Sequence, residues 1–266
     1  VALGQHVRTV PAPDPAQMAG DLGQAFAAAV QGAVDDLVRH GIKPAVLIVD
    51  TVFSSDGVFA DPAGFLQPAV DVIRKAGGLF IADEVQPGFG RTGGHWWGFE
   101  RHGLLPDMVS LGKPMGNGYP VAALVLRPEV LAEFGAKARY FNTFGGNAVA
   151  CATAIAVMEV IEDEALLHNA ATVGAHMAEG LRALAKTHAS LGPLRATGLF
   201  FGQDITRDGT PDGAEAARVV NALRDAGVLI SATGPKGHTL KIRPPLILQK
   251  AQADLFLEKL NQALKP

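Results

Sequence analysis

The chain has 266 residues, 48% hydrophobic and 18% charged, which suits a globular protein of one large or two modest domains. Its net charge of −3 and the lack of a Lys/Arg run argue against a nucleic-acid surface, whose affinity depends on neutralising phosphates. No apolar run is long enough to span a membrane, so we expect a small-molecule partner.

Cys151 is the single cysteine, which excludes an internal disulfide, and its Ala-rich surroundings predict a buried, inert thiol. The first residues lack a signal-peptide pattern, and a cytoplasmic location is therefore expected. Because the first residue is Val1 rather than Met, we expect the natural chain to continue upstream. The eight histidines are scattered without the spacing of metal ligands, so no metal site is expected.

Hydrophobic periodicity in the first part of the chain predicts alternating strands and helices. Two apolar runs, 45–50 and 79–83, enclose a helical stretch near 62–76 and are typical of a β-α-β unit in a parallel sheet. The other expected elements are a helix over 18–39, strands at 108–111 and 121–126, and a helix over 148–161. The helix over 148–161 is apolar on nearly every side, so we expect it to be buried between layers.

The pattern changes after Asp163, where apolar residues repeat every three or four positions along an amphipathic helix up to Leu184. The later segments mix strands and helices. Strands are expected at 198–205, 228–231 and 238–242, and helices at 211–226 and 251–264. We therefore predict a large α/β domain over 1–163 and a small α+β domain over 164–266.

Acidic residues end both strands of the β-α-β unit. Ligands of parallel sheets bind beyond the carboxyl ends of the strands, so we expect Asp50 and Asp83 beside one crevice. Lys113 follows the third strand between Gly112 and Pro114. A lysine in apolar, glycine-rich surroundings can lose its charge and trap a carbonyl group, while a strand-end carboxylate can hold a protonated ring nitrogen. Lys113 and Asp83 together suggest a pyridoxal phosphate site.

Three glycines after Asp83 raise a different interpretation. Gly88, Gly90 and Gly93 have the G-x-G-x-x-G spacing of nicotinamide-binding proteins. That fingerprint requires a helix to begin at once, and residues 94–98 lack helical character. The residues therefore disfavour a dehydrogenase.

Two further groups of polar residues leave their roles open. Residues 141–147 precede a predicted helix, where Thr143 and free backbone N–H groups suit either an anion site or a simple helix cap. Lys241 and Arg243 lie at the end of a predicted strand, where cations either face solvent or bind a carboxylate.

Three motifs occur in the order and spacing of class III (omega) aminotransferases, and the resemblance runs from about His6 to the C-terminus. They are DEVQPGFGRTG at 83–93, LGK at 111–113 and NTFGGN at 142–147. The resemblance implies fold type I, with a large, mostly parallel α/β domain and a small C-terminal domain. It also implies an enzyme that uses pyridoxal 5'-phosphate to move an amino group from an amine or amino acid to a 2-oxo acid.

The same resemblance assigns roles to individual residues. Lys113 resembles the Schiff-base lysine, Asp83 the partner of the pyridinium nitrogen, Val85 the ring-face contact and Gln86 the contact to the ring hydroxyl. Thr143 resembles the threonine that reaches the phosphate of the neighbouring subunit's cofactor, which implies a homodimer.

The substrate-binding positions of the family are altered here. Its strand-end glutamate and its substrate-binding arginine fall at Asp50 and Lys241, so the charges are kept but not the residue types. A lysine lacks the guanidinium fork that grips a carboxylate with two bonds, and Arg243, two residues on, is a candidate replacement.

The amino-acid sequence of residues 113–118, 140–146 and 240–245 is most similar to that of a subgroup that includes ethanolamine-phosphate phospho-lyase. A phospho-lyase acting on a phosphorylated amino alcohol or amino acid is therefore an alternative. Family members also carry a preceding segment with a Gly-Ser phosphate-binding turn and an aromatic residue that stacks on the ring, and neither is found in this sequence. An inactive fragment of either enzyme is the remaining alternative.

Overall fold

The computed structural model describes residues 3–265 and divides the chain into two compact units. The first is formed by Val1–Thr51, Asp61–Gly88 and Gly98–Met158, and the second by Val52–Ala60, Phe89–Trp97 and Glu159–Pro266. The long second segment begins close to the predicted boundary after residue 163. The loops 52–60 and 89–97 group with the second unit, which a single linear boundary does not anticipate.

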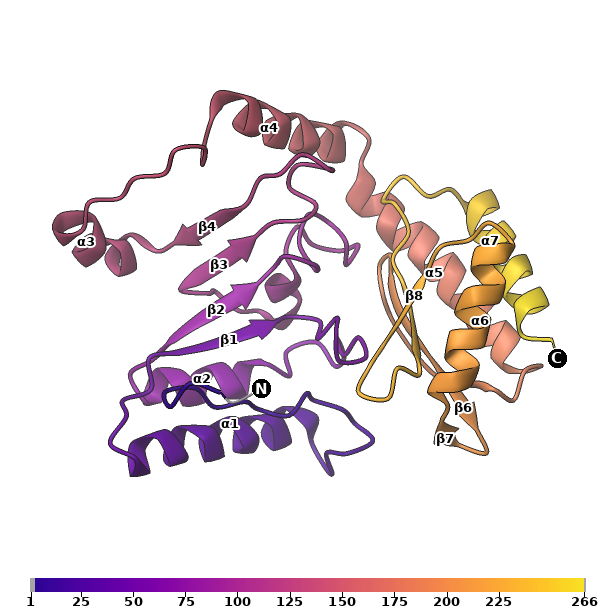
Figure 1. Ribbon diagram of the computed structural model, residues 1–266, viewed down its shortest axis with the longest axis horizontal. Helices are drawn as coiled ribbons and strands as arrows, with labels where there is room; N and C mark the ends of the chain where they lie inside the picture. Colours follow the sequence, from indigo (N-terminus) through magenta and orange to yellow (C-terminus); the bar gives the residue numbers. More distant parts are fainter. Residues whose placement is uncertain (1–2, 266) are drawn as a thin grey trace. The chain divides into compact units, whose positions relative to one another are not determined.

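The first unit is built on a four-stranded sheet with the order β1-β2-β3-β4 (Figure 1). Its strands are β1 (Val46–Asp50), β2 (Leu79–Asp83), β3 (Met108–Leu111) and β4 (Ala123–Leu126). The first three strands run parallel and β4 runs antiparallel to β3. The predicted α/β architecture is confirmed, because the continuous apolar runs form the parallel strands.

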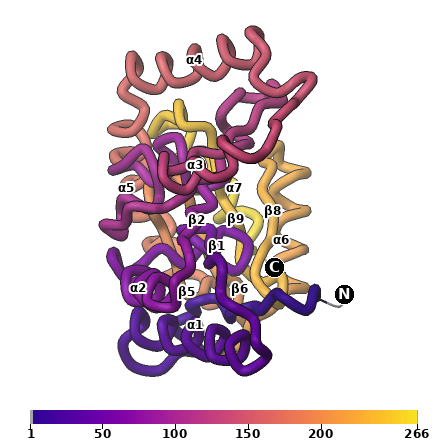
Figure 2. Tube along the Cα trace, turned by 90° about the vertical axis from the view of Figure 1, so that its left-hand side faces the viewer, coloured from indigo at the N-terminus to yellow at the C-terminus, as the bar shows by residue number. Residues whose placement is uncertain are grey.

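Two helices pack beside this sheet, and they are α1 (Leu22–Arg39) and α2 (Gln67–Lys75). Helix α2 packs against β1 and β2, and α1 packs against α2 (Figure 1, Figure 2). The first helix begins later than predicted because the Asp21 side chain caps it, accepting a hydrogen bond from Gln24 N–H at 2.8 Å. It ends at His40, where Gly41 takes a φ of 72°.

The remaining helices of this region are η1 (Gly98–His102), α3 (Pro128–Lys137) and α4 (Ala148–Asp163), and the first two were not predicted. The expected burial of α4 is wrong for this chain. Val149 is 61% exposed and Ile155 50% exposed, and Cys151 is exposed rather than buried. The apolar composition of α4 was recognised correctly, but no layer formed by the described residues covers the helix on all sides.

The second unit is an antiparallel sheet with helices. The strand order is β5-β6-β9-β8, and the short β7 pairs with β6. The elements are α5 (Leu166–Ala185), β5 (Leu191–Thr197), β6 (Phe200–Arg207), β7 (Thr210–Pro211), α6 (Gly213–Asp225), β8 (Ser231–Thr233), β9 (Thr239–Ile242) and α7 (Lys250–Ala263). The strand β5 was not predicted, and the strand expected at 228–231 is wrong except for Ser231, where β8 begins.

The core of the second unit lies between these helices and the sheet. Its fully buried residues include Leu181 on α5, Leu223 on α6, Leu260 on α7 and Phe201 on β6. The spacing of three and four that predicted α5 is the spacing of its buried face.

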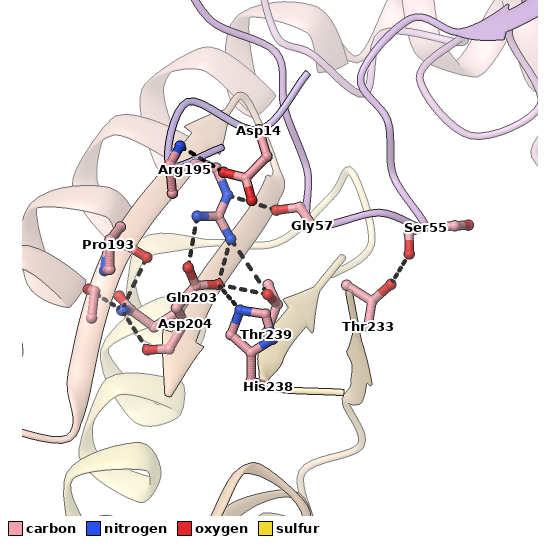
Figure 3. A network of polar contacts seen from close by, with 12 residues as sticks. Asp14, Ser55, Gly57, Pro193, Arg195, Gln203, Asp204, Thr233, His238 and Thr239 are labelled. Carbon is pink, nitrogen blue, oxygen red and sulfur yellow. Dashed lines mark hydrogen bonds and ion pairs between the residues drawn. The ribbon is translucent and has the colours of Figure 1, made fainter. Parts of the chain in front are cut away.

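A polar network ties the loop 52–60 to the small sheet (Figure 3). Arg195 on β5 forms an ion pair with Asp204 on β6 and donates from Nε to the Gly57 carbonyl at 2.6 Å. Thr233 Oγ1 donates to the Ser55 carbonyl, also at 2.6 Å. These bonds explain why a loop that follows β1 belongs to the second unit.

Residues 3–265 contain neither a candidate membrane-spanning helix nor a candidate metal-binding group. No helix among them is long and apolar enough to cross a membrane. No group of three or more His, Cys, Asp or Glu side chains among them is placed to hold a metal ion.

Removing a core side chain tests the packing of the second unit. Leu181→Ala is expected to lower the free energy of unfolding by about 2–5 kcal/mol, because Leu181 is fully buried and its truncation leaves a cavity. Denaturant unfolding measures this. Leu255→Ala on α7 is the matched control, since Leu255 is 52% exposed and its loss should change stability by less than about 1 kcal/mol. Equal losses in the two variants would contradict this packing.

Candidate active site

The ends of three neighbouring strands bring the strand-end residues together. In the parallel pair β1 and β2, Asp50 is the register partner of Asp83, and in the pair β2 and β3, Asp83 is the partner of Ser110. Neighbouring strands lie about 4.8 Å apart, so these residues are side by side at one edge of the sheet. Asp50 and Asp83 are therefore neighbours, while their place beside one crevice stays a prediction.

Asp83 begins the turn that carries Val85 and Gln86. Its Oδ1 accepts a hydrogen bond from Val85 N–H at 3.1 Å, and its side chain is partly exposed. The carboxylate is thus oriented by the backbone of the turn that follows it, while remaining accessible.

Lys113 lies in the turn after β3, next to the Asp83 turn. Met115 N–H donates to the Gly112 carbonyl at 2.7 Å and closes the lysine turn. A Cβ placed on Gly112 would lie 3.6 Å from both methyl groups of Val85, so the two turns are in close proximity. The Lys113 side chain is exposed, and the apolar burial expected from the sequence is not found in the described part of this chain.

Thr143 lies in an exposed segment before α4. Asn142 Oδ1 accepts from Gly145 N–H at 2.8 Å, and Asn147 Oδ1 accepts from Ala150 N–H at 3.0 Å. The second bond caps α4, so the cap expected among these residues is made by Asn147. Thr143 itself is exposed.

Two cations of the second unit lie near one aromatic ring, and a third, Arg91, lies close to Arg243. Lys241 is buried on β9 with its Nζ 5.7 Å from the centre of the Phe200 ring, and Arg243 Cζ lies 6.0 Å from the same centre. Arg91 donates to the Pro244 carbonyl, and burial together with the nearby Arg243 lowers its pKa to about 10. Lys241 and Arg243 are therefore close to one another, as predicted from their spacing on one strand face.

Glu84, directly after Asp83, is a buried residue that the sequence reasoning did not single out. Its Oε1 accepts from Thr51 Oγ1 at 2.8 Å and from Phe99 N–H at 2.9 Å, and its Oε2 accepts from Gly98 N–H at 2.7 Å. Burial raises the pKa of Glu84 to about 7, and the three hydrogen bonds, which favour the carboxylate, limit the rise. The sequence signal that could have revealed Glu84 was the alternation of side-chain direction between neighbouring residues, which directs Glu84 away from the face of Asp83.

His102 extends this cluster of buried polar groups. Gly64 N–H donates to His102 Nδ1 at 3.2 Å, so the proton is on Nε2, which donates to the Thr51 carbonyl at 3.1 Å. Burial lowers the pKa of His102 to about 4 and keeps the imidazole neutral. Thr51, the residue after Asp50, is thus held through its side chain by Glu84 and through its backbone by His102.

The residues at this sheet edge fit the ring and aldehyde of pyridoxal phosphate. Asp83 is an accessible carboxylate suited to a protonated ring nitrogen, and Val85 offers an apolar side chain beside the lysine turn. Lys113 supplies an exposed amine on the neighbouring turn.

A comparison with protein families shows which family the chain belongs to. The family model for class III aminotransferases matches residues 3–264. The chain belongs to the class III aminotransferase family. Members of this family use pyridoxal phosphate, and the resemblance seen in the three motifs is confirmed.

Individual relatives include both kinds of enzyme considered above. Alanine–glyoxylate aminotransferase 2-like of Drosophila melanogaster is 39% identical over 249 residues, which are 92% of this chain and 50% of the relative. Ethanolamine-phosphate phospho-lyase homolog 1 of Caenorhabditis elegans is 38% identical over 248 residues, 91% of this chain and 53% of the relative. The chain thus spans about half the length of these relatives.

A solved structure supports the same fold. A phospholyase from Arthrobacter in complex with phosphoethanolamine matches with a TM-score of 0.94 at 38% identity, covering 99% of this chain and 64% of that chain. The predicted fold type I architecture of the class III aminotransferases is therefore confirmed.

The buried pair Glu84 and His102 predicts opposite pH dependences of stability. Between pH 4.5 and about 7 native Glu84 keeps a proton that the unfolded chain releases, so its contribution falls as pH rises. Between pH 6.5 and about 4 native His102 lacks a proton that the unfolded chain binds, so its contribution falls as pH falls. The two effects oppose one another in the wild type.

Substituting His102 is expected to remove its own pH-dependent contribution, which opposes that of Glu84. In His102→Gln, the free energy of unfolding should decrease by about 3 kcal/mol relative to wild type as pH rises from 4.5 to 7, measured by urea unfolding at a series of pH values. The exposed His6→Gln is the control and should follow the wild-type profile. Parallel profiles for His102→Gln and wild type would refute the assignment.

Proposed function

We propose that this chain carries the reaction centre of a pyridoxal-phosphate-dependent aminotransferase, which moves an amino group from an amine or amino acid to a 2-oxo acid. The observation that carries the proposal is the register of Asp50, Asp83 and Ser110, which puts the carboxylate turn beside the turn of Lys113. Family membership supports the same reaction class.

Pyridoxal phosphate, when bound, supplies an aldehyde and an electron-withdrawing ring. Asp83 holds the proton of the ring nitrogen, Val85 packs on the ring face and Gln86 contacts the ring hydroxyl. The hydrogen bond from Val85 N–H orients Asp83 for this role. A carboxylate at this position favours the charged ring, which keeps it electron-withdrawing.

Lys113 has two roles in the proposed reaction. Its Nζ would hold the cofactor aldehyde, and the neutral amine would move a proton at the substrate's amino-bearing carbon. Its exposure within this chain leaves the amine accessible for both steps.

Three charged residues are proposed to bind substrate. Asp50, next to Asp83 at the sheet edge, suits an amino group or a polar part of the substrate. Lys241 and Arg243 suit the carboxylate of an amino acid or 2-oxo acid, because the two cations lie near the same Phe200 ring.

A homodimer is proposed as the active unit, with Thr143 contributing to the phosphate site of the neighbouring subunit. Exposed aromatic side chains beside Thr143 support a protein partner here, since Tyr140, Phe141 and Phe144 are 73%, 80% and 80% exposed. A cytoplasmic location is part of the same proposal and rests on the single cysteine.

A phospho-lyase is the second candidate function. The gathering of Arg91, Lys241 and Arg243 suits a phosphate group as well as a carboxylate. The similar phospholyase from Arthrobacter, solved in complex with phosphoethanolamine, supports this alternative. The same residues Lys113 and Asp83 would serve an elimination that releases phosphate.

Substitution of the lysine tests the reaction centre. With pyridoxal phosphate and borohydride, wild type is expected to gain one cofactor mass on the peptide that contains Lys113, and Lys113→Ala is expected to gain none. Peptide mass spectrometry measures this. The control Lys137→Ala removes an exposed lysine of α3 and should label like wild type. Absence of labelling in wild type would favour the inactive-fragment alternative, and labelling at another lysine would refute the assignment.

Product analysis separates the two candidate functions. The aminotransferase proposal predicts amino transfer that requires a 2-oxo acid, and Arg243→Ala is expected to raise the KM for that acid roughly ten- to a hundredfold by removing a charged hydrogen-bond donor. The control Arg224→Ala lies on α6, where Arg224 pairs with Asp225, and should leave the KM unchanged. Phosphate release from phosphoethanolamine without a 2-oxo acid would instead support the phospho-lyase.

A further inference from the structure

The Glu84 carboxylate connects three separate stretches of the first unit. It accepts a hydrogen bond from the hydroxyl of Thr51, the residue after Asp50. It also accepts hydrogen bonds from the backbone N–H groups of Gly98 and Phe99, at the beginning of η1. Glu84 is 0% exposed, so these donors replace water around the carboxylate. A buried carboxylate is tolerated only where its hydrogen bonds are satisfied, so the contacts of Glu84 are a specific feature of the fold.

The packing around Gly98 shows how closely the three stretches are fitted. A Cβ on Gly98 would lie 2.3 Å from Thr51 Oγ1, 2.8 Å from Pro87 Cβ and 3.3 Å from Glu84 Oε1. No side chain fits at this position without moving Thr51 or the turn after Glu84. The absence of a side chain is therefore what lets the backbone N–H of Gly98 reach the carboxylate.

We propose that Glu84 is a positioning residue for the segment 83–86, which it clamps to Thr51 and to residues 98–99 so that Asp83, Val85 and Gln86 are held in place for the cofactor. The proposal rests on the proposed function only in naming this segment as the cofactor contact.

The clamp acts on Asp83 through the backbone. Glu84 follows the last residue of β2, and its bonds to Thr51, Gly98 and Phe99 fix the backbone between Asp83 and Val85. The hydrogen bond from Val85 N–H to Asp83 Oδ1 spans Glu84, and a shift of the Glu84 backbone changes its geometry. Holding Glu84 thus holds the direction of the Asp83 carboxylate.

Protonation is expected to loosen this clamp. The titratable groups that surround Glu84 are Asp50, whose charge raises the pKa of Glu84, the adjacent Asp83, and the neutral His102, which bonds to the Thr51 carbonyl. A proton on Glu84 places an O–H among three donors and removes an acceptor from one of them. The group that loses its acceptor is the amide of Gly98 or that of Phe99.

Amide hydrogen exchange, followed by NMR on the full chain, tests the clamp and its reach. In Glu84→Gln, protection of Gly98 or Phe99 is expected to fall roughly tenfold or more, because one charged acceptor is lost. Protection of Val85 should fall as well, although its acceptor is Asp83. In wild type the same losses should appear as pH is lowered through about 7, and Glu84→Gln should show no such transition.

A control with the same change of charge separates positioning from net charge. Glu133 on α3 is exposed and pairs with Lys137, so Glu133→Gln is expected to leave the protection of Val85, Gly98 and Phe99 unchanged. Thr51→Val removes one of the three donors while keeping the side-chain shape. If Glu84→Gln does not fold, this variant decides the outcome by the same loss at Val85.

Cofactor affinity gives the second readout. The dissociation constant for pyridoxal phosphate, measured from the visible absorbance of the bound cofactor, is expected to rise several-fold in Glu84→Gln and to stay unchanged in Glu133→Gln. The proposal would be overturned if the Val85 amide were as well protected from exchange in both Glu84→Gln and Thr51→Val as it is in wild type. If wild type binds no cofactor, the proposed function fails, while the exchange at Val85 still decides whether Glu84 positions this segment.

Discussion

The shared register of β1, β2 and β3 is the constraint on which the candidate site depends. It places Asp50, Asp83 and Ser110 side by side where three parallel strands end. The turns that leave these strands carry Val85 and Lys113, so the positions of the reactive groups follow from the strand pairing. A slip of one residue in β2 would turn Asp83 to the other face of the sheet and bring Glu84 in its place.

Buried polar bonds extend this constraint to the loops. Glu84 and His102 hold Thr51 in the first unit, while Arg195 and Thr233 hold the loop 52–60 in the second. The backbone after β1 therefore passes from one set of anchors to the other within a few residues. His102, Arg195 and Thr233 bond main-chain carbonyls, and Glu84 bonds the Thr51 hydroxyl, which gives the loop a defined path without regular structure.

Local patterns in the sequence predict the strands better than they predict the contacts. The bounds of β2 and β3 follow from apolar runs with clear ends, and α5 follows from its spacing. Residues 228–230 have the sequence pattern of a strand, but pairing with β9 begins only at Ser231. The position of the neighbouring strand determines which residues can form the hydrogen bonds of the sheet. Burial of α4 and the role of Glu84 could not be predicted, since both depend on which distant segment lies against them.

The protonation state of the cofactor ring tests the central claim, that the strand register presents Asp83 to the ring nitrogen. Nitrogen NMR with cofactor labelled at the ring nitrogen, bound to this chain at neutral pH, reports that state directly. We expect a protonated nitrogen in wild type and a deprotonated one in Asp83→Asn, because the amide cannot stabilise the added charge. The same nitrogen shift in both proteins would contradict it.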